Sequence, residues 1–142
     1  VNAVIGAEKS SHLYFSEIYG FDDGIYAVAR MAELASASQT SISSILDSFP
    51  KYYSSSIRAV EVPERLKQLV MEKVAVRLKR IADRVIEIDG VKAYIEDGWL
   101  LVRPSNTMPQ IKYTAEARSL EGLKGLLDLA ESTLGEVLRE SA

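Results

Sequence analysis

The pattern of hydrophobic and polar residues divides the chain into two parts with different predicted architectures. The first part opens with a strand-like apolar run at residues 1–5, a loop of polar and small residues at 6–12, and a short apolar segment at 13–15. Apolar residues then recur three and four positions apart at 25–35 and 42–49, which predicts two helices. One or two strands and two helices cannot bury a two-sided sheet, so this part is predicted to be the tail of a larger α/β domain.

Residues with capping chemistry mark the ends of the two predicted helices. Asp22 or Asp23 can cap the first helix, because a side-chain oxygen at that position accepts hydrogen bonds from free backbone N–H groups. Thr40 or Ser41 can begin the second helix in the same way. Pro50 then ends it, since proline has no backbone N–H to continue the helical ladder.

A polar stretch at residues 52–56, with three consecutive serines, predicts a boundary between two domains. The expected domains are residues 1–53 and 57–142. A hinge between them is expected at residues 51–56, because this connection carries no apolar pattern.

The second part begins with a predicted strand at residues 57–62 and a helix with Pro63 in its first turn, where proline fits well. The apolar positions of this helix are expected to face inward, and they are Leu66, Leu69 or Val70, Val74, Leu78 and Ile81. Its basic positions are expected to stay mostly in solvent, and they are Lys67, Lys73, Arg77 and Arg80.

Three strands are predicted next, at residues 84–88, 91–96 and 99–103. Asp89-Gly90 and Asp97-Gly98 separate them, and each dipeptide is the typical signal for a two-residue hairpin turn with positive φ. The three segments are therefore expected to pair as antiparallel neighbours.

A fourth strand and a long helix complete the chain. At residues 110–117, Ile111, Tyr113 and Ala115 are expected on one face of a strand. The helix is expected at residues 120–139, with inward positions Leu120, Leu123, Leu127, Ala130, Leu134 and Leu138. The predicted fold class of this part is α+β, a β-α-β-β-β-α type domain. Its four- to five-stranded antiparallel sheet carries helices on one face, and roughly 85 residues are enough to close a core.

Composition and charge narrow the classes of function. The chain has a net charge of −3 and a pI near 5.3, so it has no overall attraction for nucleic acid. It has no cysteine, which excludes disulfide and thiolate chemistry. No apolar run approaches the roughly 18 residues of a transmembrane helix and no leader opens the chain, so a cytoplasmic protein without a membrane partner is expected. The first residue is Val1 rather than methionine, which suggests a processed chain or, more simply, an excised piece.

The loop at residues 103–109 combines groups that bind phosphate. Arg103 offers a planar fork that matches phosphate oxygens. Hydroxyl and amide donors follow it, and they come from Ser105, Asn106 and Thr107. Backbone N–H groups can add an anion-binding nest, and two prolines stiffen the ends of the loop, which lowers the entropy lost on binding. The alternative interpretation is a polar turn that happens to contain an arginine.

The loop at residues 8–12 carries a second group of polar side chains. The Glu8 carboxylate can accept hydrogen bonds from two neighbouring sugar hydroxyls, and Ser10 can assist it. His12 is the only histidine, so the sequence gives little support for a histidine-based metal site or a catalytic triad. The alternative interpretation is a surface connection whose charged side chains are simply solvated.

Taken together, these loops resemble one family, the α-D-phosphohexomutases of the phosphoglucomutase and phosphomannomutase group. Residues 6–12 (GAEKSSH) resemble the sugar-binding loop of the family's third domain. Residues 19–24 (YGFDDG) resemble the run that opens the last long helix of that domain. Residues 103–107 (RPSNT) resemble the phosphate loop of the fourth domain. The resemblance covers nearly the whole chain, with three motifs in the family's order.

This resemblance implies a function and a division of roles. Members of the family interconvert hexose 1-phosphate and 6-phosphate of glucose or mannose through a hexose 1,6-bisphosphate, with a phosphoserine in the first domain and Mg²⁺ held by the second. Here Glu8 and Ser10 would bind the 3- and 4-hydroxyls of the sugar, and His12 would lie beside the sugar or the reacting phosphate. The phosphate that is not being transferred would be held by Arg103, Ser105, Asn106 and Thr107. The expected domains are then a sugar-binding portion and a phosphate-binding domain.

Parts of the family's machinery are not found in this sequence. It has no Thr-Ala-Ser-His-Asn type nucleophile loop and no Asp-x-Asp-x-Asp metal triplet, and Asp22-Asp23 is interpreted as a helix cap. The nucleophile and the Mg²⁺ ligands are therefore expected in N-terminal domains of the parent enzyme, and this chain alone is expected to be inactive. Ala7 and Ser11 stand where the family usually has glycine, and Met108 stands where it has glutamate.

Two other classes of function remain open. One is a sugar-phosphate binding module without catalysis, and the other is an interaction module that uses the antiparallel sheet as a platform. The acidity of the chain and the lack of a basic and aromatic sheet face argue against nucleic acid as the partner of such a module. By resemblance, Asn106 in place of glycine favours glucose or mannose over glucosamine.

Overall fold

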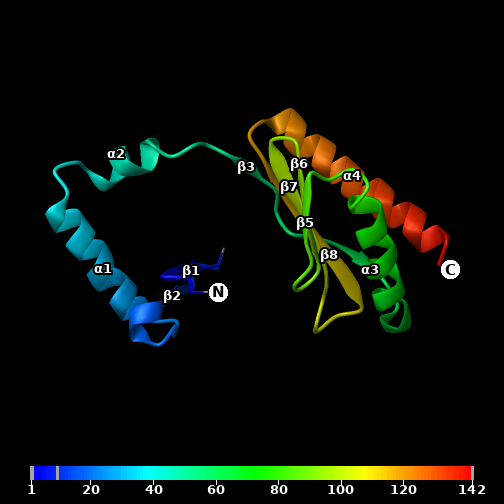
Figure 1. Ribbon diagram of the computed structural model, residues 1–142, viewed down its shortest axis with the longest axis horizontal. Helices are drawn as coiled ribbons and strands as arrows, with labels where there is room; N and C mark the ends of the chain where they lie inside the picture. The colour runs from blue at the N-terminus through cyan, green and yellow to red at the C-terminus, as the bar shows by residue number, and fades with distance from the viewer. Residues whose placement is uncertain (1, 9, 142) are drawn as a thin grey trace. The chain divides into compact units, whose positions relative to one another are not determined.

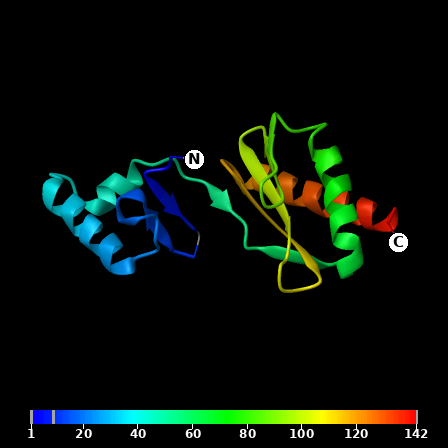
Figure 2. The ribbon, with the colours of Figure 1, turned by 60° about the horizontal axis from the view of Figure 1, so that its bottom comes forward.

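The computed structural model describes residues 2–8 and 10–141, and it divides into two units, Val1–Pro50 and Lys51–Ala142 (Figures 1 and 2). Each unit is described by itself. Val1, at the start of the first predicted strand, and Lys9, in the first predicted loop, lie outside the described residues.

The first unit begins with a hairpin of strands β1 (Ile5–Ala7) and β2 (Leu13–Phe15). The strand predicted at residues 1–5 is therefore misplaced: pairing with β2 draws Gly6 and Ala7, predicted as loop, into the ladder opposite Tyr14 and Leu13. A short 3₁₀ turn follows, η1 (Ser16–Ile18).

Helices α1 (Gly24–Ala37) and α2 (Ile42–Asp47) complete this unit. The Asp23 carboxylate caps α1 by accepting hydrogen bonds from two backbone N–H groups, each at 2.9 Å. Ser41 caps α2 by accepting from the backbone N–H of Ser44 at 3.2 Å. Both helices are thus confirmed, although α2 ends at Asp47, before Pro50.

The described part of the first unit has little core of its own. Phe15 is the one buried hydrophobic residue described in it, at 8% exposure. The apolar residues of α1 are largely exposed instead, among them Ile25 at 86% and Val28 at 70%. A helix that presents an apolar stripe without cover is typical of an element cut from a larger packed layer.

The second unit is built on a six-stranded antiparallel sheet with the order β3-β8-β7-β6-β5, in which β4 also pairs with β8. The strands are β3 (Tyr53–Ser54), β4 (Arg58–Glu61), β5 (Arg84–Ile86), β6 (Val91–Ile95), β7 (Gly98–Pro104) and β8 (Gln110–Ala117). The antiparallel arrangement is as predicted, with one strand more than the four or five expected.

The additional strand is β3, which comes from the polar stretch predicted as a domain boundary. Tyr53 and Ser54 pair with the end of β8, and the backbone N–H of Ser55 donates to the carbonyl of Ala115 at 2.9 Å. The predicted hinge is therefore wrong for residues 53–55. Polarity did not prevent strand formation, because a ladder is made by backbone groups and an edge strand needs no apolar side chains.

The two predicted Asp-Gly turns have different geometries from those expected. Strands β5 and β6 pair as far as Ile86 opposite Lys92, so the connection is longer than two residues, and Ile88 is 91% exposed. In the next hairpin Ile95 pairs with Gly98, and the two-residue loop is Glu96-Asp97, with Glu96 at φ 49°. Gly98 belongs to β7, where it pairs with Ile95 and Ala117, and the position suits glycine because a Cβ there would lie 2.5 Å from the Glu116 carbonyl oxygen.

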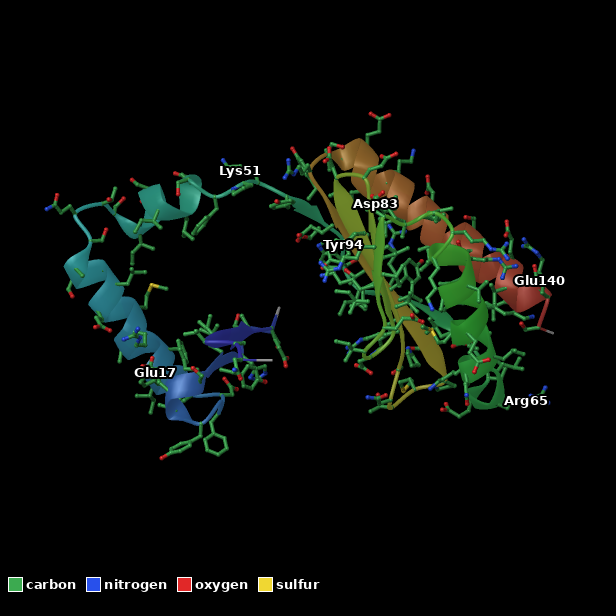
Figure 3. All side chains as sticks on the ribbon, in the orientation of Figure 1. Glu17, Lys51, Arg65, Asp83, Tyr94 and Glu140 are labelled. Carbon is green, nitrogen blue, oxygen red and sulfur yellow. The ribbon has the colours of Figure 1, made fainter. Side chains whose placement is uncertain are left out.

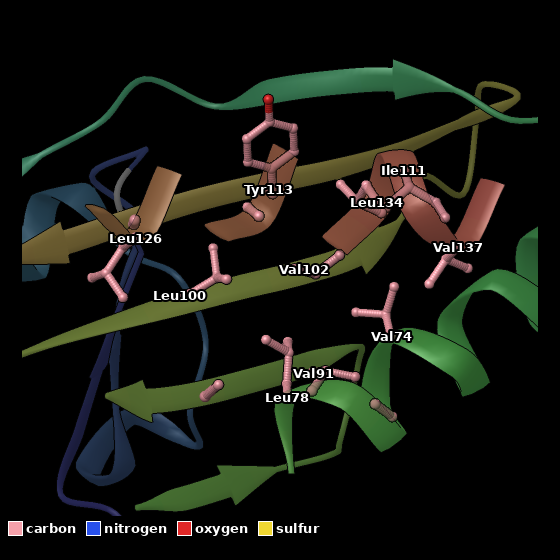
Figure 4. Close-up of a cluster of buried hydrophobic side chains, with 14 of the residues drawn as sticks. Val74, Leu78, Val91, Leu100, Val102, Ile111, Tyr113, Leu126, Leu134 and Val137 are labelled. Carbon is pink, nitrogen blue, oxygen red and sulfur yellow. The ribbon is translucent and has the colours of Figure 1, made fainter. Parts of the chain in front are cut away.

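Helices α3 (Glu64–Leu78) and α4 (Leu120–Arg139) cover one face of the sheet (Figure 2). The predicted bounds of α4 are confirmed. Figure 4 shows the core that they close with alternate residues of the strands, including Val74, Leu78, Leu100, Val102, Ile111, Tyr113 and Leu134. Of the alternatives Leu69 and Val70, Val70 is the buried one, at 0% exposure. The inward positions predicted at Ile81 and Leu120 are wrong, since these side chains are 51% and 64% exposed.

The opposite face of the sheet carries cations stacked on aromatic rings. Trp99 and Lys92 alternate with buried core residues, which places them on this face. The Lys92 ammonium lies 4.1 Å from the centroid of the Trp99 ring and 5.2 Å from that of Tyr94, which Figure 3 labels. The Arg84 guanidinium lies 5.7 Å from the Tyr94 ring. The prediction that no sheet face is basic and aromatic is therefore wrong.

No helix in the described part of the chain is both long and apolar enough to span a membrane.

Candidate functional site

The predicted sugar-binding residues lie on the loop that joins β1 and β2. The backbone N–H of Glu8 donates to the His12 carbonyl at 3.0 Å, and the N–H of Ser11 donates to the Glu8 carbonyl at 3.0 Å. Ser11 takes the left-handed conformation, with φ 69°, where the family usually has glycine. Ala7, the other departure in this loop, lies in β1 and needs no such conformation.

The Glu8 carboxylate is oriented by two hydroxyl groups. Ser10 Oγ donates to Glu8 Oε2 and the Tyr14 hydroxyl donates to Glu8 Oε1, both at 3.1 Å. The hydrogen bond to Glu8 raises the pKa of Tyr14, because it stabilises the protonated phenol. Each carboxylate oxygen has a second lone pair, so Glu8 can still accept from two ligand hydroxyls. Tyr14 is a supporting residue that the sequence prediction missed.

His12 is paired with Asp22. His12 Nδ1 contacts Asp22 Oδ2 in a short hydrogen-bonded ion pair, and Asp22 Oδ1 accepts from the backbone N–H of Leu13 at 3.1 Å. The hydrogen bond to Asp22 raises the pKa of His12. The same bond, helped by the Leu13 N–H, lowers the pKa of Asp22. Of the two predicted cap candidates, Asp23 therefore caps α1, and Asp22 pairs with His12 instead.

We expect the substitution Asp22→Asn to lower the pKa of His12, because the carboxylate that stabilises the imidazolium is gone. In the unaltered chain the raised pKa means that the contact stabilises the loop at pH below the ordinary histidine range and is lost as pH rises through the raised value. At the acid end the contact is lost as pH falls through the lowered pKa of Asp22. An NMR titration of the single histidine measures this shift. Asp47→Asn, at the end of α2, is the control, and an identical His12 titration in both variants would contradict the assignment.

The predicted phosphate loop begins in the last two residues of β7, Arg103 and Pro104, and continues between β7 and β8, where backbone hydrogen bonds close it. The N–H of Ser105 donates to the Gln110 carbonyl at 2.9 Å, and the N–H of Gln110 donates to the Met108 carbonyl at 2.7 Å. The N–H of Val62 donates to the Pro109 carbonyl at 2.8 Å, which ties the loop to the segment after β4. These three backbone hydrogen bonds constrain the loop without any ligand.

A buried lysine of α3 is hydrogen-bonded to the backbone of the same loop. Lys67, on α3, is 6% exposed, and its ammonium donates to the carbonyl of Ser105 at 2.6 Å and lies 2.8 Å from Glu64 Oε2. The prediction that Lys67 stays in solvent is wrong, because the carbonyl and the carboxylate together replace the water that a buried ammonium loses. The sequence did contain a signal for this burial, because Lys67 stands on the hydrophobic side of an amphipathic helix.

The four predicted phosphate-binding side chains face different surroundings. The Arg103 guanidinium is half exposed and lies 3.4 Å from Asp89 Oδ2. Asn106 and Thr107 are exposed, and their side chains make no hydrogen bond within the described part of the chain. Ser105 is only 5% exposed, and its hydroxyl has no partner among the described residues.

A cavity of about 640 Å³ lies between this loop and α3. Ser105, Asn106 and Lys67 line it, whereas Arg103 and Thr107 do not. The rest of its charged lining is acidic and consists of Glu64, Glu72 and Glu87. The structure thus brings Ser105 and Asn106 together with Lys67, and leaves Arg103 outside the cavity.

Among residues 2–8 and 10–141, no group of three histidine or acidic side chains is placed to hold a metal ion. The residues present therefore do not fit the Mg²⁺ that the resemblance implies for the parent enzyme.

Two family models match successive parts of the chain. Residues 1–53 match "Phosphoglucomutase/phosphomannomutase, alpha/beta/alpha domain III", and residues 58–130 match "Phosphoglucomutase/phosphomannomutase, C-terminal domain". A crystal structure of a phosphoglucomutase/phosphomannomutase family protein from Burkholderia thailandensis superposes with a TM-score of 0.75 at 28% identity, covering 99% of this chain and 30% of that one.

Curated relatives agree with these matches. A probable phosphoglucosamine mutase of Methanosarcina barkeri is 34% identical over 137 residues, which cover 96% of this chain and 30% of the relative. A phosphomannomutase/phosphoglucomutase of Pseudomonas aeruginosa is 32% identical over 136 residues, which cover 95% of this chain and 29% of the relative. The chain belongs to the phosphoglucomutase/phosphomannomutase family, as the C-terminal portion of an α-D-phosphohexomutase. It spans about 30% of the length of these relatives.

Proposed function

We propose that this chain is the substrate-binding C-terminal portion of a phosphohexomutase that interconverts hexose 1-phosphate and 6-phosphate through a bisphosphate. The observation that carries the proposal is a pre-formed loop with free donors. Backbone hydrogen bonds and Lys67 hold the loop, while the side chains of Asn106 and Thr107 have no hydrogen-bond partner among the described residues. A rigid loop with unused donors binds an anion at low entropic cost.

Each proposed phosphate ligand has a distinct part. Arg103 supplies a permanent charge and two parallel donors, and its weak pair with exposed Asp89 is easily replaced by phosphate. Asn106 and Thr107 donate from the loop itself. Ser105 adds a hydroxyl that lacks a partner in the described structure and is a further donor to the same ligand.

In the first unit, Glu8 and Ser10 are proposed to bind the sugar. A carboxylate held by Ser10 and Tyr14 presents its remaining lone pairs to two adjacent hydroxyls, for which the 3- and 4-hydroxyls of a hexose are suited. Glucose, mannose and glucosamine share these hydroxyls and differ at C2, so Glu8 does not discriminate among them. We propose glucose or mannose phosphates as substrates, and glucosamine 6-phosphate is the necessary comparison because some relatives are named as phosphoglucosamine mutases.

His12 is proposed to lie beside the sugar or the reacting phosphate. Its ion pair with Asp22 fixes the ring through Nδ1 and favours the imidazolium. The opposite nitrogen, Nε2, is then free to donate a hydrogen bond to a substrate oxygen. In phosphoryl transfer the protein contributes mainly positioning and charge neutralisation, and these residues supply both.

The phosphoserine, the Mg²⁺ ligands and the hexose 1,6-bisphosphate chemistry are assigned to the other domains of the parent enzyme. We therefore expect the 142-residue chain to bind hexose phosphate without interconverting its 1- and 6-phosphates. A coupled assay for glucose 6-phosphate formation from glucose 1-phosphate tests this, and turnover by the purified chain would overturn the assignment.

Binding itself is tested by NMR titration. We expect inorganic phosphate or glucose 6-phosphate to shift the amide signals of residues 105–108, and Arg103→Ala to abolish these shifts because the principal charge is lost. Arg80→Ala, an exposed arginine outside the loop, is the matched control. Flat titrations in the unaltered chain, or equal shifts in the Arg103→Ala variant, would reduce this loop to an ordinary turn.

A further inference from the structure

The cavity of about 640 Å³ beside α3 has an acidic and apolar lining that phosphate binding does not explain. We propose that it binds a small organic cation, an amine carried on a short apolar chain with an uncharged polar end. Its volume is within the range usual for small-molecule pockets. This site is additional to the proposed phosphate site and borders the same loop.

Helix α3 forms one wall of the cavity with two rows of side chains, because residues four positions apart lie one above the other on a helix. The first row is buried or half-buried and consists of Lys67, Met71 and Ala75. The second row is exposed and consists of Glu64, Gln68 and Glu72. The ends of the exposed row lie about 12 Å apart along the helix axis. The wall therefore has a largely apolar floor and an extended acidic rim.

The rim carries more negative charge than the one lysine of the cavity neutralises. Glu64 Oε2 lies 2.8 Å from the Lys67 ammonium, so these two charges compensate each other. Glu72 accepts a hydrogen bond from the neutral amide of Gln68 at 3.1 Å, and it makes no ion pair within 4.0 Å in the described part of the chain. The carboxylate of Glu72 is therefore an uncompensated charge at the mouth of the cavity.

A further carboxylate of the lining belongs to the connection between β5 and β6. Glu87 pairs with Lys79 at 2.7 Å, but both side chains are about half exposed, so the pair is weak. Among residues 2–8 and 10–141 these acids do not form a group that could hold a metal ion, which favours an extended organic cation over a compact one. Their charge repels a phosphate from this side of the loop.

The apolar part of the lining suits the carbon chain of such a ligand. It consists of Met71, Ala75, Val91 and Pro104. Ala75 and Val91 are 7% and 3% exposed and form part of the hydrophobic core, so this surface is fixed by the fold. Methylene groups that cover it leave water, which favours binding of an alkylamine over a bare inorganic cation.

A buried hydroxyl in the lining lacks a partner. Ser105 is 5% exposed, and its Oγ makes no hydrogen bond among the described residues. A buried polar atom without a hydrogen bond is costly, and a ligand group that bonds it removes the cost. A hydroxyl can donate one bond and accept two, so a bond donated to phosphate leaves Ser105 able to accept from this second ligand.

The orientation of the ligand follows from the charges at the two ends of the cavity. The Lys67 ammonium lies 2.6 Å from the Ser105 carbonyl and repels a second positive charge there. The uncharged polar end of the ligand is therefore placed at Ser105, and its ammonium is placed toward Glu72. No covalent step is involved.

The test is a titration with aminobutanol, an amine and a hydroxyl on a four-carbon chain, followed by NMR in phosphate-free buffer. We expect the amide signals of residues 68–72 and 104–106 to shift. Glu72→Gln should bind about tenfold more weakly, since a charge-assisted contact is lost. Asp128→Asn, which removes an exposed carboxylate of α4 outside the cavity, is the control and should bind as the unaltered chain does.

Butylamine, which lacks the hydroxyl, tests the uncharged end. We expect Ser105→Ala to weaken binding of aminobutanol but not of butylamine, because only aminobutanol bonds the serine. Thermal unfolding midpoints of the variants without ligand separate binding from folding.

Three results would overturn the site. They are equal binding by Glu72→Gln and the unaltered chain, equal losses in Glu72→Gln and Asp128→Asn, and no saturable binding of either amine by the unaltered chain. None of them affects the proposed phosphate site, because Arg103→Ala tests that site with phosphate in a separate titration.

Discussion

Replacing Gly90 by alanine is expected to lower the free energy of unfolding by about 3 kcal/mol and to weaken phosphate binding at the same time. Gly90 has φ +117°, a conformation that L side chains rarely adopt. A Cβ at this position would lie 2.4 Å from the Val102 carbonyl oxygen, 2.6 Å from Arg103 Cβ and 2.9 Å from Arg103 Cα. These are mainly backbone atoms of β7 that cannot swing aside, so relief of the clash moves the strand that carries Arg103.

Urea unfolding and phosphate titration of the Gly90→Ala variant measure the two effects. Gly125→Ala is the control, because a Cβ there meets nothing within 4 Å and the residue lies inside α4. The control should gain about 0.5–1 kcal/mol, the ordinary advantage of alanine over glycine in a helix. If Gly90→Ala unfolds at the same urea concentration as the unaltered chain, the close approach of Gly90 to β7 is wrong.

Replacing Lys67 by methionine is expected to lower the free energy of unfolding by about 2 kcal/mol and to loosen the phosphate loop. Methionine keeps much of the apolar stem of the lysine, but it removes the ammonium that donates to the Ser105 carbonyl at 2.6 Å. That carbonyl belongs to a residue only 5% exposed, and it then loses its charge-assisted partner. Glu64, which is 77% exposed at its side chain, returns to solvent at little cost.

Hydrogen exchange distinguishes loosening of the loop from general destabilisation. In Lys67→Met we expect the Ser105 amide, which bonds the Gln110 carbonyl, to exchange faster than the amides of β6. Lys124→Met, an exposed lysine on α4, provides the control and should change neither stability nor exchange. Uniform acceleration across the sheet would mean that Lys67 supports the fold as a whole and has no specific hold on the loop.

Much of this protein follows from sequence pattern alone. The alternation along β8 determines which of its residues enter the core, because successive side chains of a strand face opposite ways. The helical spacing and Ser119 at the N-cap locate α4 at the predicted residues. The motifs at residues 6–12, 19–24 and 103–107 placed the chain in its family, since they preserve local chemistry in a fixed order.

Other features were decided by partners distant in sequence. Strand β3 exists because the edge of β8 offers its backbone groups, although its own residues are polar. The hairpin loop between β6 and β7 lies at Glu96-Asp97 rather than Asp97-Gly98, because Gly98 pairs with Ala117 of β8 as well as with Ile95 and so belongs to the strand. Neither fact is encoded in the segment where it is observed.

The same distinction applies to the candidate site. From the sequence, Glu8, Ser10 and His12 and the loop from Arg103 to Thr107 are candidates because the residues of each loop are neighbours in the chain, and their roles stay predictions. Only the folded chain brings Asp22 to His12 and Lys67 to the Ser105 carbonyl. These pairs join residues 10 and 38 positions apart, and their contact depends on how the elements pack, which local pattern does not specify.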